Sequence, residues 1–160
     1  MQEIFTRRSI RKYTSDVVSD KIIHEILKAG QNAPSAKNMR PWEFIVVRDK
    51  KMLATLSSLK PNAYMVKDCS FAIIALAKET TIFWQQDMGA SVQNMLLMAE
   101  HYNVGSCWIG INEEQGDIIK NLLDIPQEYN VYTMISFGYK GDNKESNNAF
   151  DVTKIHFDKF

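Results

Sequence analysis

The residues best suited to chemistry lie near the start of the chain, where positions 7–13 read RRSIRKY. Guanidinium groups bind phosphate oxygens in pairs, and a serine hydroxyl adds a short donor. In an extended chain, Arg7, Ser9 and Arg11 alternate onto one side, which suits a phosphate monoester. A solvated run of charge or a nucleic-acid-binding arm would have the same spacing. These residues therefore indicate a phosphate site without excluding the other two interpretations.

A second segment with binding potential is a loop at positions 33–42, which reads APSAKNMRPW. Pro34 and Pro41 bracket small and amide side chains, so the loop must be stiff. A stiff loop that offers backbone N–H, hydroxyl and amide groups can bind the edge of a planar heterocycle. A rigid turn anchored by Trp42 explains the same residues without a ligand, and the loop alone leaves both interpretations open.

A third segment, GSCWIGI at positions 105–111, is typical of a buried strand that ends in glycine. Glycine lets a flat ligand approach the backbone closely. A core strand followed by an ordinary turn fits the same residues.

Other catalytic signatures are missing from the sequence. There is no G-x-G-x-x-G motif, no P-loop and no G-x-S-x-G nucleophile motif. The three histidines lack metal-ligand spacing, and no pair of carboxylates indicates glycosidase chemistry. Cys69 and Cys107 lie in separate apolar runs, which predicts buried, reduced thiols rather than zinc ligands or a redox pair. Redox chemistry in this chain would therefore require a cofactor.

Hydrophobic periodicity predicts the elements that must position these segments. Helices are expected at residues 20–29, 49–59, 82–103 and 114–123, and strands at residues 44–47, 71–77, 106–110 and 131–139. Ser19 is the expected N-cap of the first helix. The second half of the long helix is apolar nearly all round, which suits a central helix or a subunit interface. This mixture of strands and helices predicts an α+β or α/β sandwich.

Length and composition limit the class of protein. The chain has 160 residues, of which 45% are hydrophobic, and this predicts a single domain with a sizeable core. Lys and Arg total 19 and Asp and Glu total 19, so general nucleic-acid binding is not expected. No apolar run is long enough to span a membrane and no signal peptide is visible, which predicts a cytoplasmic protein. Residues 140–160 are mostly polar and are expected to form an arm that reaches a partner.

In this order, the three segments resemble the nitroreductase family of FMN-dependent oxidoreductases, in particular its short members. Positions 7–13 match the family's RRSxRxY signature, positions 33–44 its APSxxNxQPWxF loop and positions 105–110 its GxCWIG strand. The resemblance implies one nitroreductase-like domain over residues 1–160, an α+β protein built as an α-β-α sandwich with a mostly antiparallel central sheet. It also implies a homodimer with one FMN in each of two composite sites at the interface.

The resemblance assigns cofactor-binding residues to each segment. The phosphate and ribityl chain would be held from one subunit by Arg7, Arg8, Ser9 and Arg11. The isoalloxazine would be contacted from the other subunit by Pro34, Ser35, Ala36 and Asn38. The residues along the ring, with a backbone N–H near flavin N5, would be Trp108, Ile109, Gly110 and Ile111. A further candidate, for the pyrimidine edge, is Asn62.

The sequence departs from the family pattern at two places. Arg40 stands where the family usually has glutamine. The family often supplies Arg or Lys from its C-terminal region to the phosphate, but the matching positions 147–150 read NNAF. Lys140 and Lys144 are the substitutes nearby.

The segment between residues 78 and 87 is too short for the substrate lid of larger family members. We therefore expect an open substrate site, with Phe83 and Trp84 as lining residues. No residue is expected to bind a metal.

The activity that the resemblance implies is NAD(P)H-dependent hydride transfer through flavin N5 to electron-poor acceptors such as nitroaromatics or quinones. Donor and acceptor would use the site in turn (ping-pong), and no side chain need act as an obligate acid or base. One alternative is an FMN-binding or storage protein with little turnover, and another is a dehalogenase-like or flavin-fragmenting enzyme. A non-flavin module that binds phosphoproteins or nucleic acid would rest on the N-terminal cations alone.

Overall fold

The computed structural model describes residues 2–142, 144–145 and 150–160. Its centre is an antiparallel sheet of four strands in the order β1-β2-β4-β3. The strands are β1 (Trp42–Val47), β2 (Phe71–Ala77), β3 (Val104–Gly110) and β4 (Asn130–Tyr139). All of β2 is buried, which explains why its sequence is a continuous apolar run.

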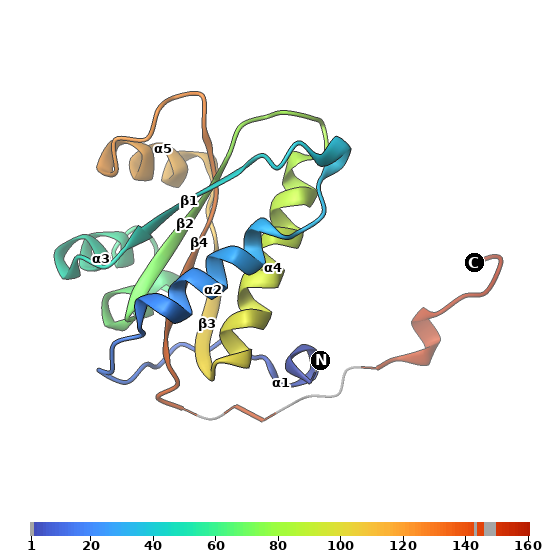
Figure 1. The fold of residues 1–160 in the computed structure, drawn as a ribbon, viewed down its shortest axis with the longest axis horizontal. Helices are drawn as coiled ribbons and strands as arrows, with labels where there is room; N and C mark the ends of the chain where they lie inside the picture. Colours follow the sequence, from blue (N-terminus) through green and yellow to red (C-terminus); the bar gives the residue numbers. More distant parts are fainter. Residues whose placement is uncertain (1, 143, 146–149) are drawn as a thin grey trace.

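Helices cover both faces of this sheet, and Figure 1 shows the three layers. On one face lie α2 (Asp20–Gln31) and α4 (Trp84–His101), and on the other lie α3 (Lys50–Ser57) and α5 (Glu113–Leu122). The shorter segments are α1 (Glu3–Thr6) and the 3-10 turns η1 (Ala36–Asn38), η2 (Pro61–Asp68) and η3 (Val152–Lys154). The predicted α-β-α sandwich is confirmed.

Each face of the sheet has its own hydrophobic core. The core beneath α2 and α4 contains Phe71 and Phe137, whose rings stack with their centroids 4.8 Å apart. The core on the α3 and α5 face includes Ile119. Because side chains alternate along a strand, Ile73 packs in the first core and Ile74 in the second. The two cores fix the sheet, and the sheet fixes the segments along its edges.

The eight predicted elements are all present, with ends shifted by at most two residues. The long helix begins at Trp84 rather than residue 82, because a turn precedes it in which Phe83 N–H donates to the Thr81 hydroxyl at 3.1 Å. Ser19 does precede α2, but its side chain makes no capping hydrogen bond with the described residues. The segments α1 and η2 were not predicted, because a four-residue helix and a 3-10 turn give no clear helical period.

The chain between α1 and α2 runs along the end of the sheet. Ser9 forms a parallel bridge with Ser106 of β3, and Ile10 N–H donates to the Ser106 carbonyl at 3.0 Å. Tyr13 then pairs with Lys140, just beyond β4. The predicted extended segment is therefore fixed against two strands.

The C-terminal residues 150–160 stand away from the rest of the chain (Figure 1). They are all exposed, including Phe150, Phe157 and Phe160, so this arm is less polar than expected. The predicted arm also includes residues 143 and 146–149, which lie outside the described residues. Within the part of the chain that the structure describes, no helix has the length and apolar character to cross a bilayer.

Candidate functional site

Cationic side chains gather around Ser9, beside β3. Arg7, Arg8 and Arg11 belong to the same segment as Ser9. Lys144 comes from beyond β4, and its Nζ donates to the Ser9 carbonyl at 2.8 Å. The two ends of the chain thus contribute to one cluster of positive charge, and such a cluster attracts an anion.

The field of these cations reaches the Cys107 thiol on the neighbouring strand. Burial raises the pKa of Cys107, and Arg11, Lys144 and Arg7 oppose that rise. These three cations therefore lie close enough together to act on a single group.

Arg8 is held in place with part of its hydrogen-bonding capacity unused. Its Nε donates to the Glu145 carbonyl at 2.9 Å, and its Nη1 donates to the Arg7 carbonyl. Its Nη2 is buried and has no hydrogen-bond partner among the described residues. Buried donors are nearly always paired, so an unpaired guanidinium nitrogen within a cation cluster suits an anionic acceptor.

The two C-terminal lysines have different partners. Lys140 forms an ion pair with Glu100 of α4, with Nζ 2.8 Å from Oε2 and both side chains largely buried. Lys144 instead lies at the predicted phosphate segment. The sequence left both lysines open as phosphate ligands, and the structure brings only Lys144 to the cations. Residues 147–149, which match the family's usual cationic stretch, lie outside the described part of the chain.

The C-terminal end of β3 offers open backbone. A Cβ added to Gly110 would meet nothing within 4 Å, and Gly110 does not have a positive φ. Neither packing nor conformation therefore requires glycine here, and a planar ligand has room to approach. Trp108 is 37% exposed on the same strand. The side chains of Ile109 and Ile111 pack in the core on the α3 and α5 face of the sheet, so they do not face this space.

A lysine that precedes η2 is tied to the same end of β3. Lys60 Nζ donates to the Gly110 carbonyl at 2.6 Å. Asn62 is exposed two residues later, so it lies near this end of the sheet.

These observations define one surface along β3. Ser9 lies beside Ser106, and Gly110 follows four residues later, which at ~3.3 Å per residue is about 13 Å. We call this surface the β3 strip; its residues are Arg7, Arg8, Ser9, Arg11, Trp108, Gly110 and Lys144. Its cationic end and its open glycine end suit a ligand that joins an anion to a flat ring.

An aromatic row connects the β3 strip to the start of α4. Tyr132 occupies a bulge in β4. Ala75 of β2 pairs with Thr133 and Leu76 pairs with Val131, so Tyr132 between them has no partner in β2. The ring of Tyr132 packs against Trp108 at 6.0 Å and against Trp84 at 6.1 Å between centroids. Burial raises the pKa of the Tyr132 phenol. Phe83, adjacent to Trp84, is half exposed.

The loop over residues 34–40 is strained and internally bonded. Lys37, Asn38 and Arg40 have φ values of 53°, 56° and 47°, which non-glycine residues rarely adopt. Ser35 Oγ accepts from Arg40 N–H at 3.0 Å, and Arg40 Nε donates to Asn38 Oδ1 at 2.9 Å. Strain of this kind costs free energy and is concentrated at functional sites.

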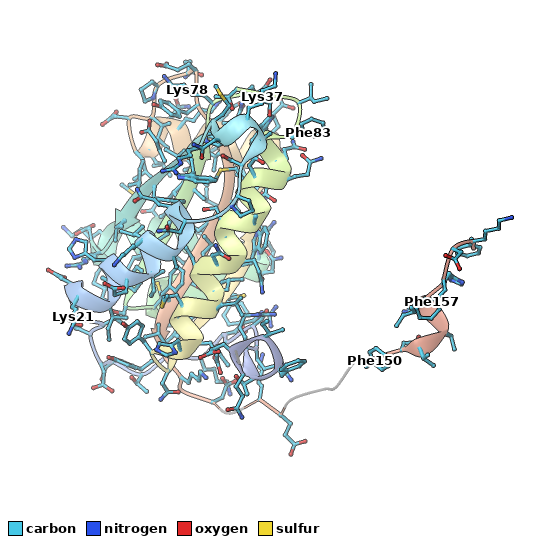
Figure 2. All side chains as sticks on the ribbon, turned by 45° about the vertical axis from the view of Figure 1, so that its right-hand side comes forward. Lys21, Lys37, Lys78, Phe83, Phe150 and Phe157 are labelled. Atoms are coloured by element: carbon cyan, nitrogen blue, oxygen red, sulfur yellow. The ribbon has the colours of Figure 1, made fainter. Side chains whose placement is uncertain are left out.

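The loop is also bonded to the first turn of α4. Ala36 N–H donates to the buried Asp87 carboxylate, at 3.0 Å from Oδ1 and 3.1 Å from Oδ2. Figure 2 shows Lys37 and Phe83 at the same end of the molecule, with both side chains at its surface. The predicted loop and the predicted substrate-lining residues therefore lie close together.

Within one chain, the loop and the β3 strip lie at opposite edges of the sheet. The loop leads into β1 and the strip follows β3, and these are the two edge strands. Three strand spacings of ~4.8 Å place these edges about 14 Å apart. The structure therefore places residues 7–11 beside Ser106, on the strand that continues through residues 108–110, whereas Pro34, Ser35, Ala36 and Asn38 precede the edge strand on the other side of the sheet.

Comparison with known proteins identifies the family. A family model described as "Nitroreductase family" matches residues 4–63 and 55–139. The chain belongs to this family. The nitroreductase segments around Ser9, Ala36 and Gly110 all fall within the matched ranges.

Three relatives show how far the nitroreductase likeness extends. The chain is 39% identical over 170 residues to an Archaeoglobus fulgidus protein, named provisionally as an NADH dehydrogenase/NAD(P)H nitroreductase, covering 100% of this chain and 98% of that one. A structure of an FMN-dependent nitroreductase from Clostridium difficile is 34% identical, with a TM-score of 0.93 and coverage of 99% and 98%. A provisionally named nitroreductase from Desulfovibrio desulfuricans, solved in complex with FMN, is 29% identical, with a TM-score of 0.88 and coverage of 99% and 96%.

Three residues of this nitroreductase site gave no signal in the sequence. Asp87 meets the loop across a separation of 51 residues, and Lys60 meets Gly110 across 50, so neither shares a motif with its partner. Tyr132 is turned toward α4 by a bulge that simple alternation along a strand does not reveal. Among the described residues, no group of three or more His, Cys, Asp or Glu side chains could hold a metal ion.

Proposed function

We propose that this nitroreductase-family protein is an NAD(P)H-dependent flavin oxidoreductase that binds FMN on the β3 strip and reduces electron-poor acceptors such as nitroaromatics or quinones. The observation that carries the proposal is the buried Nη2 of Arg8, which has no hydrogen-bond partner among the described residues and lies in a cluster of cations beside Ser106. The open space at Gly110 lies about 13 Å further along β3 from Ser106. FMN fits this donor set, since its phosphate needs cationic donors and its ring needs a flat, unobstructed backbone. When bound, FMN supplies N5 as the atom that accepts and passes on hydride.

The residues of the strip have separate tasks in this proposal. Arg7, Arg8, Ser9 and Arg11 bind the phosphate and ribityl chain, and Lys144 adds a further cation there. The residues beside the ring are Trp108, Ile109, Gly110 and Ile111, with Asn62 at the pyrimidine edge. The Ser106 carbonyl points away from β4 and accepts from Ile10 N–H, and backbone direction alternates along an edge strand. The backbone of Trp108 and Gly110 therefore also points away from β4 and would provide the N–H near N5.

The second half of each site would come from the partner of a homodimer. Pro34, Ser35, Ala36 and Asn38 would contact the isoalloxazine of the partner's FMN, which is consistent with their separation from the β3 strip of their own chain. The arm at residues 140–160 would reach the partner, and the exposed Phe150, Phe157 and Phe160 give it apolar surface to bury there.

Donor and acceptor would occupy the open face of the site in turn. Phe83 and Trp84 would line that face, and Tyr132 extends it to Trp108. Aromatic rings at this separation offer a surface on which flat, electron-poor molecules can stack. A cytoplasmic location is part of the proposal, and cell fractionation tests it.

The first test is a visible absorption spectrum of the purified protein, repeated after flavin is removed and FMN is added back. We expect the bands of bound oxidised flavin, and their bleaching by NADH or NADPH without oxygen. Steady-state oxidation of the donor with a quinone or nitroaromatic then distinguishes an enzyme from a protein that stores FMN. Flavin that binds but is never bleached favours storage, and failure to bind FMN contradicts the proposal.

A further inference from the structure

Asp87 is a carboxylate that the proposed reaction does not use, yet it is buried at the start of α4. The residue is 7% exposed, and both of its carboxylate oxygens lie within hydrogen-bond distance of one backbone donor, Ala36 N–H, at 3.0 and 3.1 Å. The first turn of a helix favours a negative charge, so α4 stabilises this carboxylate where it is. A buried carboxylate bonded to a loop backbone therefore fixes that loop relative to the helix.

The loop that Asp87 fixes requires such an anchor. Three of its non-glycine residues, Lys37, Asn38 and Arg40, have positive φ, and such strain persists only when surrounding contacts impose it. The bonds from Arg40 to Ser35 and Asn38 close the loop on itself but do not tie it to the rest of the domain. The Ala36–Asp87 bond makes that connection.

We infer that Asp87 is a positioning residue for the flavin site: it holds the strained loop in the conformation that contacts the isoalloxazine of the partner's FMN. The inference rests on the proposed function, because it assumes that FMN binds and that the loop acts across the dimer. Removing the Asp87 acceptor frees the loop, so that FMN binding must order it again. Affinity for FMN falls as a result, although Asp87 itself does not touch the flavin.

The test compares three variants of the full chain by titration of the flavin-free protein with FMN. Asp87→Ala removes the acceptor and should weaken FMN binding by about tenfold or more, the range for losing a hydrogen bond to a charged group. Asp87→Asn keeps an oxygen acceptor and should bind within about threefold of the unmodified protein. Asp20→Ala is the matched control, because Asp20 also lies in the first turn of a helix but pairs with Arg48. It should leave FMN affinity unchanged.

Thermal unfolding of the flavin-free variants separates positioning from general stability. FMN affinity for Asp87→Ala equal to that of Asp20→Ala would overturn the inference. Loss of FMN affinity and thermal stability in Asp87→Asn as severe as in Asp87→Ala would also overturn it, because the acceptor would then not be what matters.

Mixed dimers test the action across the interface. A heterodimer of an Asp87→Ala chain with an Arg8→Ala chain has one site in which both halves are intact, and it should bind one FMN tightly. Absence of this tight site contradicts action on the partner's flavin. A heterodimer of Arg8→Ala with Asn38→Ala tests the composite site without Asp87. If that dimer also lacks a tight site, the proposed composite site itself is wrong, and if the unmodified protein binds no FMN, the proposed function is wrong.

Discussion

At the scale of single residues, Lys140 and Lys144 differ in whether a neighbouring carboxylate already balances their positive charge. Glu100 already neutralises Lys140, whereas Lys144 donates to a neutral carbonyl, which leaves its charge available to an anion. We expect Lys144→Ala to weaken FMN binding by about 1–2 kcal/mol, the range for losing a charge-assisted contact that is partly exposed. Titration of the flavin-free protein measures this change, and its size should decrease at high salt.

Lys140→Ala provides the matched control for that prediction. It leaves Glu100 largely buried without its partner and should lower the free energy of unfolding. FMN affinity, measured at a temperature where the protein stays folded, should change little. A larger loss of FMN affinity in Lys140→Ala than in Lys144→Ala would contradict the assignment of Lys144 to the phosphate.

The residues of the candidate site differ in how far sequence could predict them. Arg7, Ser9 and Arg11 stand at alternate positions in one short segment, so their spacing indicated a shared target before any fold was known. Asp87 lies 51 residues from the loop it contacts, and no local pattern carries that information. Spacing within one segment thus indicated the proposed phosphate ligands, whereas it gave no indication of the carboxylate that holds the separate loop in place.

At the scale of elements, substitutions at two glycines of β3 distinguish the packing of the β3 strip from its binding of a ligand. A Cβ at Gly105 would lie 2.9 Å from Ile10 Cβ, which is anchored on the backbone of the phosphate segment and cannot turn away. Gly105→Ala should therefore lower the free energy of unfolding by about 1–3 kcal/mol, as overpacking does. It should also weaken FMN binding, because the clash pushes Ile10 and its neighbours off β3. Chemical denaturation and FMN titration measure the two effects.

Gly110→Ala changes the same strand at a position where the added Cβ would have no other atom within 4 Å. The flavin-free protein should keep its free energy of unfolding within about 0.5 kcal/mol, as at other open sites. FMN affinity should still fall, because the added methyl group occupies space proposed for the ring. Unchanged FMN affinity in Gly110→Ala would place the ring elsewhere.

The elements themselves were largely predictable because each long element carries one clear period. Burial on both sides explains the continuous apolar run of β2, and burial on one side explains the apolar face of α2 that contains Ile23 and Ile26. The sheet order β1-β2-β4-β3 was not predicted, because periodicity says nothing about which strands are neighbours. The bulge at Tyr132 was missed for a related reason: it depends on the pairing of β4 with β2.

At the scale of the whole molecule, the proposed site links FMN binding to association. The β3 strip and the loop adjoin opposite edge strands of one sheet, and in the proposed composite site they come from two different chains. A ligand that binds only the dimer stabilises the dimer by mass action, and dilution must in turn weaken ligand binding. The exposed arm acts on the same equilibrium, because burying a side chain such as Phe157 contributes about 2 kcal/mol.

The last prediction follows from this linkage. Sedimentation should give twice the chain mass of 18.4 kDa, and dilution should release FMN together with the change to monomer. Removing residues 150–160 deletes the exposed phenylalanines but retains Lys144, so dimer dissociation should rise at least tenfold, or about 1.4 kcal/mol, while FMN affinity at saturating protein stays the same. Flavin fluorescence followed during serial dilution of both forms makes the comparison. FMN retention that does not depend on protein concentration, in a chain that sediments as a monomer, would show that one subunit holds the whole site.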